Sequence, residues 1–130
     1  MEEVTAALRV RMSVADAHYG GGLVSGAALV ALWHDVATEL CIRHDGDEGL
    51  FAGYSSIEFL LTVHAGDLIE ARGTITHVGN TSREMNFEAL RYARPTPDVS
   101  DSAADLVEPP ELVARGTGIC VVKKDRQRRT

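Results

Sequence analysis

The stretch SGAALVALWHDVATELCI, residues 25–42, decides the fold. Its large apolar residues recur at the spacing of one helix face, at Leu29, Trp33, Val36 and Leu40. Ser25 stands where a side chain would cap the first helical turn. The pattern therefore predicts a helix over residues 25–42, about 27 Å long at 1.5 Å per residue. Such a helix is long enough to lie across a whole sheet.

Alternating apolar and polar residues predict strands in most of the remaining chain. The expected strands cover residues 8–14, 54–63, 67–78, 82–94 and 111–122. Gly79-Asn80 suits a tight hairpin turn. In the strand at 54–63, the residues expected on the buried face are Ile57, Phe59, Leu61 and Val63. One helix and one sheet must cover each other's apolar faces, so we predict an α+β domain with the helix against a curved antiparallel sheet.

Composition limits the class of protein. The chain has 130 residues, 45% of them hydrophobic, and a formal net charge of −6, which argues against a nucleic-acid binder. We expect a single domain over residues 1–125 and a solvated basic tail at 126–130. The chain has no signal-like or membrane-spanning segment, so we expect a soluble cytoplasmic protein that contacts no membrane. Cys41 and Cys120 are expected to be reduced and buried.

Two features point to contacts between copies of the chain. A lone two-layer domain leaves sheet edges open, and pairing of edges in a homo-oligomer would cover them. The acidic, proline-bounded segment at residues 95–110 is long for a structureless connection. We expect this segment to be either a mobile cover or a loop packed at a subunit boundary. A homodimer is the predicted smallest active unit, with a trimer of dimers as one possible larger assembly.

Motifs along nearly the whole chain, from about Met12 to Asp125, carry a family resemblance. They are DAHYGGGLVSGA, WHDVATEL, DGDEGLFAGYSSIEF, AGDLIEARGTITHVGNTS, FEALR, EPPELVARGTG and VVKKD. The chain resembles the β-aminoacyl-CoA ammonia-lyases, which act on β-alanyl-CoA or 3-aminobutyryl-CoA. The resemblance implies a hotdog fold, in which an antiparallel sheet of about five strands wraps one long helix and two protomers join their sheets. It also implies coenzyme A as part of the substrate and no separate cofactor. Gly22 departs from the polar residue, often Asn, expected at that position in the family.

Elimination of ammonia from a 3-aminoacyl thioester needs donors for the thioester oxygen, a base for the α-proton and a polar site for the leaving ammonium. The glycines at 20–22 would let a thioester approach bare backbone, and the first helical turn would supply N–H donors. Asp35 and Glu39 share a helix face away from the apolar stripe. We predict that Asp35 is the base and that Glu39 holds the ammonium or shares the proton.

Further candidates surround these groups. His18 would polarise or enclose the acyl group at the mouth of the loop, with Asp16 orienting it. The substrate-binding candidates are Asp16, Tyr19, Gly22, Leu23, Val24, Ser25, Tyr54 and Glu58, the last two expected from the partner subunit. For Glu58, solvent exposure on the outward face of the strand is the favoured explanation. The candidate cations for the coenzyme A phosphates are Arg83, Arg91, Lys123 and Lys124.

Other chemistries fit less well. His34, Cys41 and His44 have no supporting acidic ligand, so no metal site is predicted. The glycine run lacks the Lys-Ser or Lys-Thr of a P-loop, and no serine lies in a Gly-x-Ser-x-Gly motif. Two alternatives to the lyase stay open. One is an acyl-CoA thioesterase with Asp35 or Glu39 as general base, and the other is a non-catalytic acyl-CoA-binding module.

Overall fold

The computed structural model describes residues 3–129, and its central element is helix α1, Gly26–Asp45. The Ser25 side chain accepts a hydrogen bond from the backbone N–H of Ala27 (3.2 Å), so the expected N-cap is confirmed. The helix continues three residues beyond the predicted end and stops at Gly46, whose φ of 72° is left-handed. The Gly46 N–H closes the last turn on the carbonyl of Ile42 (2.9 Å). Within residues 3–129, no helix has the length and apolarity that crossing a membrane requires.

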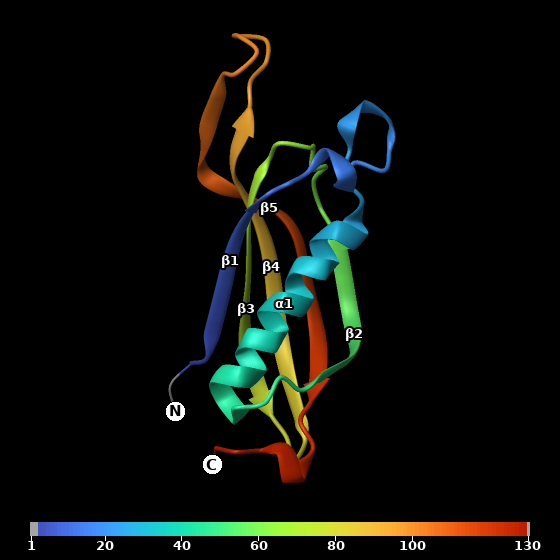
Figure 1. The fold of residues 1–130 in the computed structure, drawn as a ribbon, viewed down its shortest axis with the longest axis vertical. Coiled ribbons are helices and arrows are strands. Elements are labelled where there is room, and N and C mark those ends of the chain that lie inside the picture. The colour runs from blue at the N-terminus through green and yellow to red at the C-terminus, as the bar shows by residue number, and fades with distance from the viewer. Residues whose placement is uncertain (1–2, 130) are drawn as a thin grey trace.

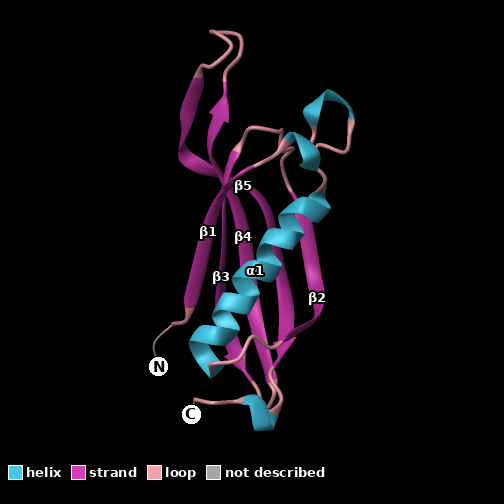
Figure 2. Cartoon of the chain, in the orientation of Figure 1, coloured by secondary structure: helices cyan, strands magenta, loops and turns pink. Residues whose placement is uncertain are grey.

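Five antiparallel strands form one sheet in the order β1-β3-β4-β5-β2, and α1 lies across one face of it (Figures 1 and 2). The strands are β1 (Thr5–Arg11), β2 (Leu50–Phe59), β3 (Leu68–Val78), β4 (Ser82–Pro95) and β5 (Ala104–Val121). The predicted two-layer α+β architecture is therefore confirmed. The boundaries of β1 and β2 were placed three or four residues too late, because alternation alone does not show where pairing stops.

The core lies between α1 and the sheet. Trp33 is fully buried, stacks on Phe87 of β4 with ring centroids 5.7 Å apart, and donates from Nε1 to the carbonyl of Glu88 (3.1 Å). A Cβ atom on Gly116 of β5 would lie 3.1 Å from the Trp33 ring. Glycine at this position therefore lets the helix approach the sheet closely.

The predicted buried face of β2 is wrong in part. Val63 is buried, but it lies beyond the strand, whereas Ile57, Phe59 and Leu61 are exposed. Strand β2 is an edge of the sheet, so no neighbouring strand of the same chain covers its outer side. An exposed apolar edge of this kind is suited to pairing with another chain.

The segment at 95–110 is a hairpin rather than a loop. Strands β4 and β5 continue into it, with Pro95 opposite Ala104 and Ala93 opposite Leu106, before the pairing shifts at residues 107–110. This hairpin rises beyond the rest of the sheet, in orange at the upper end of Figure 1. We call residues 95–108 the arm. The expectation of a loop is wrong, because the strand pairing overrides the many turn-forming residues of the segment, whereas a place at a subunit boundary stays a prediction.

The basic residues at the C-terminus are exposed, as a solvated tail would be, but they contact the domain. Arg128 donates from its backbone N–H to the carbonyl of Asp45 (2.9 Å) and from Nη1 to that of Gly46 (3.0 Å). Arg129 donates to the carbonyl of Arg43 (2.9 Å). These cations lie at the end of α1 where carbonyl groups point outward, which is the favourable end of the helix dipole for positive charge.

Candidate functional site

The glycine loop, residues 20–22, forms a short turn between Tyr19 and Leu23. Gly21 and Gly22 have φ values of 74° and 76°, a conformation that other residues rarely adopt. A Cβ atom on any of the three glycines would meet nothing within 4 Å. Backbone conformation therefore requires glycine at positions 21 and 22, and open space rather than close packing surrounds all three positions.

The base of the loop is held to the segment that follows β2. Ala65 donates to the carbonyl of Gly22 (2.9 Å), and Val24, which is buried, donates to the carbonyl of Val63 (2.8 Å). Leu23 forms an isolated bridge with His64. Leu23 and Val24 thus anchor the loop by their backbones and position the start of α1.

Asp16 organises the approach to the helix, though not as predicted. Its carbonyl accepts hydrogen bonds from the N–H groups of His18 (3.1 Å) and Ser25 (3.1 Å). Its carboxylate accepts from the N–H of Ser13 (3.2 Å) and caps a short turn at residues 14–16. The expectation that this carboxylate orients the His18 ring is therefore not met. His18 and Tyr19 are exposed beside the open space of the loop.

Phe59 lies over the first residue of α1 and was missed by the sequence reasoning. A Cβ atom on Gly26 would come within 2.5 Å of the Phe59 ring. The ring itself is exposed on its other side. Phe59 is therefore an accessible apolar surface beside the helix start. The only sequence signal is the pairing of a glycine at the first helical position with an aromatic residue at the end of a strand.

Asp35 and Glu39 lie on α1 as predicted, but in different surroundings. Asp35 is exposed and has no hydrogen-bond or ion-pair partner among residues 3–129. Glu39 pairs with Arg43, one turn further along (2.7 Å). Asp35 lies nine residues beyond Gly26, which is about 14 Å along the helix axis. A small acyl group held at the start of α1 cannot reach Asp35 of the same protomer.

Tyr54 and Glu58 point to opposite faces of β2. Residues four apart in a regular strand share a face, but the pairing with β5 shifts between Tyr54 and Ser56. Tyr54 packs among Trp33, Phe51 and other aromatic rings under α1, and its hydroxyl is buried without a hydrogen-bond partner among residues 3–129. Burial raises the pKa of Tyr54 above its usual range. Glu58 instead pairs with Arg115 on the outer face (2.9 Å).

Arg83 is not placed to bind coenzyme A. Its side chain is only 2% exposed and donates two hydrogen bonds to the carboxylate of Asp45 (2.8 and 2.9 Å). Its remaining contacts are with the carbonyls of Gly79 and Ser82. Burial alone would raise the pKa of Asp45, but hydrogen bonding to Arg83 and His44 and their charges lower it. This is a structural ion pair that joins the end of α1 to β4.

Arg91 lies in a second buried network, so it too is not placed to bind the phosphates of coenzyme A as predicted. It is 7% exposed and contacts Asp67 (3.0 Å), Glu111 (2.9 Å) and the carbonyl of Thr62 (2.7 Å). Burial opposes its charge, but the hydrogen bonds to both carboxylates raise the pKa of Arg91. The network ties β4 to β5 and to the connection between β2 and β3.

Lys123 and Lys124 are the two predicted phosphate contacts that stay accessible. Both are exposed, and neither has an ion-pair partner among residues 3–129. They lie near the C-terminus, at the lower end of the molecule, whereas the glycine loop, drawn in blue, lies at the upper end (Figure 1). The two regions are separated by the length of α1, so a single protomer does not bring them together.

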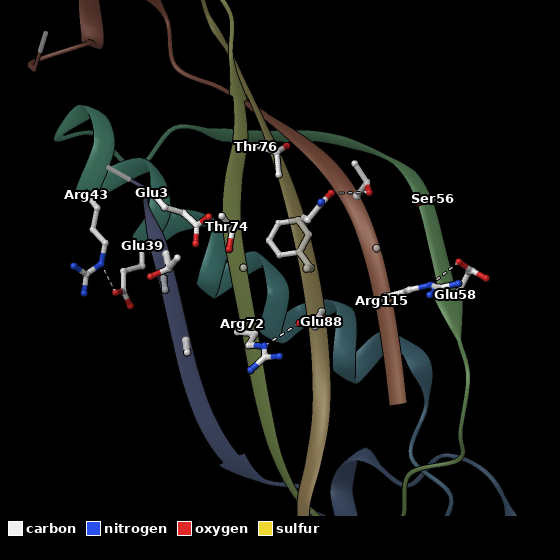
Figure 3. Close-up of a pocket in the computed structure, with 18 residues that line it drawn as sticks. Glu3, Glu39, Arg43, Ser56, Glu58, Arg72, Thr74, Thr76, Glu88 and Arg115 are labelled. Atoms are coloured by element: carbon white, nitrogen blue, oxygen red, sulfur yellow. Dashed lines mark hydrogen bonds and ion pairs between the residues drawn. The ribbon is translucent and has the colours of Figure 1, made fainter. Parts of the chain in front are cut away.

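A groove of about 960 Å³ lies over the outer face of the sheet and extends past β1 to α1 (Figure 3). Most of its charged residues pair with one another, as in Arg72–Glu88 and Arg115–Glu58 (both 2.9 Å). Glu39 and Glu58 line this groove, but Asp35 and the glycine loop do not. The groove therefore reaches Glu39 but contains neither the predicted base nor the glycine loop. In the described part of the chain, no three His, Cys, Asp or Glu side chains gather as metal ligands do.

The chain was compared with known families and proteins. The family model described as the Thioesterase superfamily matches residues 21–94. A protein from Acetoanaerobium sticklandii named 3-aminobutyryl-CoA ammonia lyase is 57% identical over 122 residues, which cover 94% of this chain and 97% of that protein.

Solved structures agree with this match. The β-alanyl-CoA:ammonia lyase from Clostridium propionicum superposes with a TM-score of 0.92 and 42% identity, over 98% of this chain and 91% of that one. A hexameric hotdog fold thioesterase of Campylobacter jejuni has a TM-score of 0.73 at 17% identity, over 94% of this chain and 86% of that one, and shows the fold alone. With one helix against a five-stranded sheet, this chain has the hotdog fold, belongs to the thioesterase superfamily and, within it, to the β-aminoacyl-CoA ammonia-lyase family.

Proposed function

We propose that this protein catalyses the reversible elimination of ammonia from a short 3-aminoacyl-CoA, such as 3-aminobutyryl-CoA or β-alanyl-CoA. The observation that carries the proposal is the 57% identity, over 94% of the chain, to a protein named 3-aminobutyryl-CoA ammonia lyase. In this reaction a base removes the proton next to the thioester carbonyl, and the C–N bond at the next carbon breaks to release ammonia. The product is the enoyl-CoA, and the reverse reaction adds ammonia to it.

The site is completed by two protomers. The helix start and Asp35 of one chain lie about 14 Å apart along α1, too far for one acyl group to contact both. The exposed apolar edge at β2 favours pairing with a second copy. Antiparallel pairing of two β2 edges would direct the two copies of α1 in opposite senses. The glycine loop of one protomer would then face Asp35 of the partner subunit, with a homodimer as the smallest active unit.

In this arrangement each group has one task. The glycine loop and the first turn of α1 donate N–H groups to the thioester oxygen as negative charge grows on it. Asp35 of the partner subunit removes the α-proton, because it is exposed and has no ion-pair partner among residues 3–129. Glu39 holds the ammonium group or shares the proton, which requires it to exchange its contact with Arg43. His18 and Tyr19 enclose the acyl group.

The phosphates of coenzyme A need local positive charge in a chain of net charge −6. Lys123 and Lys124 are exposed, and in an antiparallel dimer they would lie toward the partner's glycine loop. We assign the phosphates to these two lysines. No cofactor beyond the coenzyme A of the substrate is required, and the cytoplasm is the compartment that we propose.

The test is to offer crotonyl-CoA or acryloyl-CoA with ammonium and follow the loss of the conjugated double bond. Free thiol is assayed in parallel. Loss of the double bond without thiol release is the expected result. Thiol release with the double bond intact would identify a thioesterase, and binding of the thioester with neither reaction would identify an acyl-CoA-binding module.

A further inference from the structure

The arm exposes both unpaired acidic side chains and large apolar side chains. Its four acidic residues are Asp98, Asp101, Asp105 and Glu108, and residues 95–110 contain no lysine or arginine. None of the four carboxylates has an ion-pair partner among residues 3–129. Val99 and Leu106 are 77% and 70% exposed. Apolar side chains this exposed on a projecting hairpin are suited to contact with another molecule.

The opposite end of the molecule has the complementary character. Arg126, Arg128 and Arg129 are exposed there, and none of them pairs with a carboxylate within residues 3–129. Leu50, at the first position of β2, is 76% exposed at this end. We call these four residues the basic end. Lys123 and Lys124, which the proposed function assigns to coenzyme A, are left out of it.

The arm and the basic end cannot meet within one chain. They lie at opposite ends of the long axis, and the arm rises on the side away from β2 (Figure 1). A contact through the arm is therefore separate from pairing at the β2 edge. We propose that the arm of one copy docks on the basic end of a second copy, joining β2-paired dimers into a larger assembly. The inference concerns assembly and holds whichever reaction the site performs.

Opposite charge and exposed apolar residues both support a second copy as the occupant. The arm has a formal charge of −4, and the three arginines of the basic end contribute +3. Val99 and Leu106 of one copy would pack against Leu50 of the other copy, and this contact would cover apolar surface on both. A contact between two different surfaces closes into a ring when the rotation between copies allows it. Exposed charge pairs are screened by salt, so the assembly should weaken as ionic strength rises.

The test measures molecular mass by analytical ultracentrifugation over a range of protein concentrations. Reversal of two charges in the arm, Asp98→Lys with Asp101→Lys, is expected to raise the dissociation constant of the larger assembly at least about tenfold. Reversal at the basic end, Arg126→Glu with Arg129→Glu, should do the same. A chain in which all four acidic residues of the arm become lysine and all three arginines of the basic end become glutamate exchanges the charges, to +4 and −3, and should recover much of the loss.

The control is Glu48→Gln with Glu84→Gln, which also removes two carboxylates but leaves the arm intact. Thermal melting checks that each variant folds. An arm variant with the mass of the unmodified protein would overturn the proposal, as would a folded, fully exchanged variant that does not recover. An unmodified protein that is only a dimer at micromolar concentrations would also overturn it. If the basic-end variant loses affinity for coenzyme A with no change in mass, this end binds phosphate and not the arm.

Discussion

The two ends of helix α1 differ in how their polar groups are satisfied. At the C-terminal end, Asp45 is buried against Arg83, and Gly46 and Arg128 close the last turn. At the N-terminal end, Ser25 provides the only side-chain cap among the described residues, and the glycine loop beside it is open. One end is closed by a buried ion pair that a ligand cannot reach. The other leaves backbone and space available, which is where binding can occur.

The largest expected effect is on stability, at the closed end. Arg83→Met leaves the carboxylate of Asp45 buried without its partner, and the loss of unfolding free energy should be about 3–5 kcal/mol. Urea denaturation of the purified protein measures it. Arg115→Met is the matched control, because its pair with Glu58 is about half exposed and screened by water, so its loss should change stability far less. Equal losses in the two variants would remove the distinction between the ends.

Asp35→Asn should affect turnover and not stability. The substitution keeps the shape of an exposed side chain, so unfolding free energy should change by less than about 0.5 kcal/mol. The rate of ammonia addition to crotonyl-CoA should fall at least ~10²-fold if Asp35 is the base. Near-normal addition, together with loss of activity in a His18 or Glu58 variant, would place the base elsewhere.

Glu39→Gln provides a contrast at the same face of α1. A carboxylate that holds an ammonium group contributes little to a neutral enoyl chain. The variant should therefore weaken binding of 3-aminobutyryl-CoA more than binding of crotonyl-CoA, which competition experiments with the two thioesters can measure. Equal weakening of both would show that Glu39 does not contact the amine.

Substitutions in the glycine loop can distinguish backbone strain from blocked access of the thioester. Gly20 does not have a positive φ, and a Cβ atom there meets nothing, so Gly20→Val should fold normally but weaken thioester binding. Gly21→Val should weaken binding and also cost about 1–2 kcal/mol of stability, because its φ is 74°. Thermal melting and thioester titration together distinguish the effects. Normal binding by the Gly20 variant would mean that the loop is a plain turn.

Tyr54→Phe should have the smallest effect. The hydroxyl is buried without a partner within residues 3–129, so its removal should leave stability unchanged or raise it by up to about 1 kcal/mol. Activity should also be retained if the hydroxyl stays buried in the dimer. A clear loss of activity with normal stability would instead support the predicted role of Tyr54 in substrate binding.

Local signals predicted the helix, and they did so because its start is determined by adjacent residues. Ser25 caps the turn that immediately follows it, and the apolar stripe alone identifies the face that packs on the sheet. The pairing of β3 with β4 was likewise predicted, from the hairpin signal at residues 79–80, whereas the order of the other strands was not. Neither the helix nor this hairpin requires knowledge of a distant contact.

The misplaced site residues depend on contacts far apart in the sequence. Arg83 and Arg91 are separated by even numbers of residues from Met85, Phe87 and Ala89 in β4 and so share their face of the strand. Their position on the core face could therefore be predicted from the sequence. Their partners Asp45 and Asp67 are 38 and 24 residues away, and nothing local pairs them. The shift in pairing after Tyr54, which turns Glu58 outward, is likewise a property of the contact with β5.

Trp33 is the chain's one tryptophan, and it lies at the centre of the contact between α1 and the sheet. Its indole is fully buried and its N–H is bonded to a strand carbonyl, so its fluorescence should be emitted at the short wavelengths of an apolar environment. Separation of the helix from the sheet exposes this single fluorophore to water. The protein thus contains its own optical probe of folding, located away from the glycine loop and the arm.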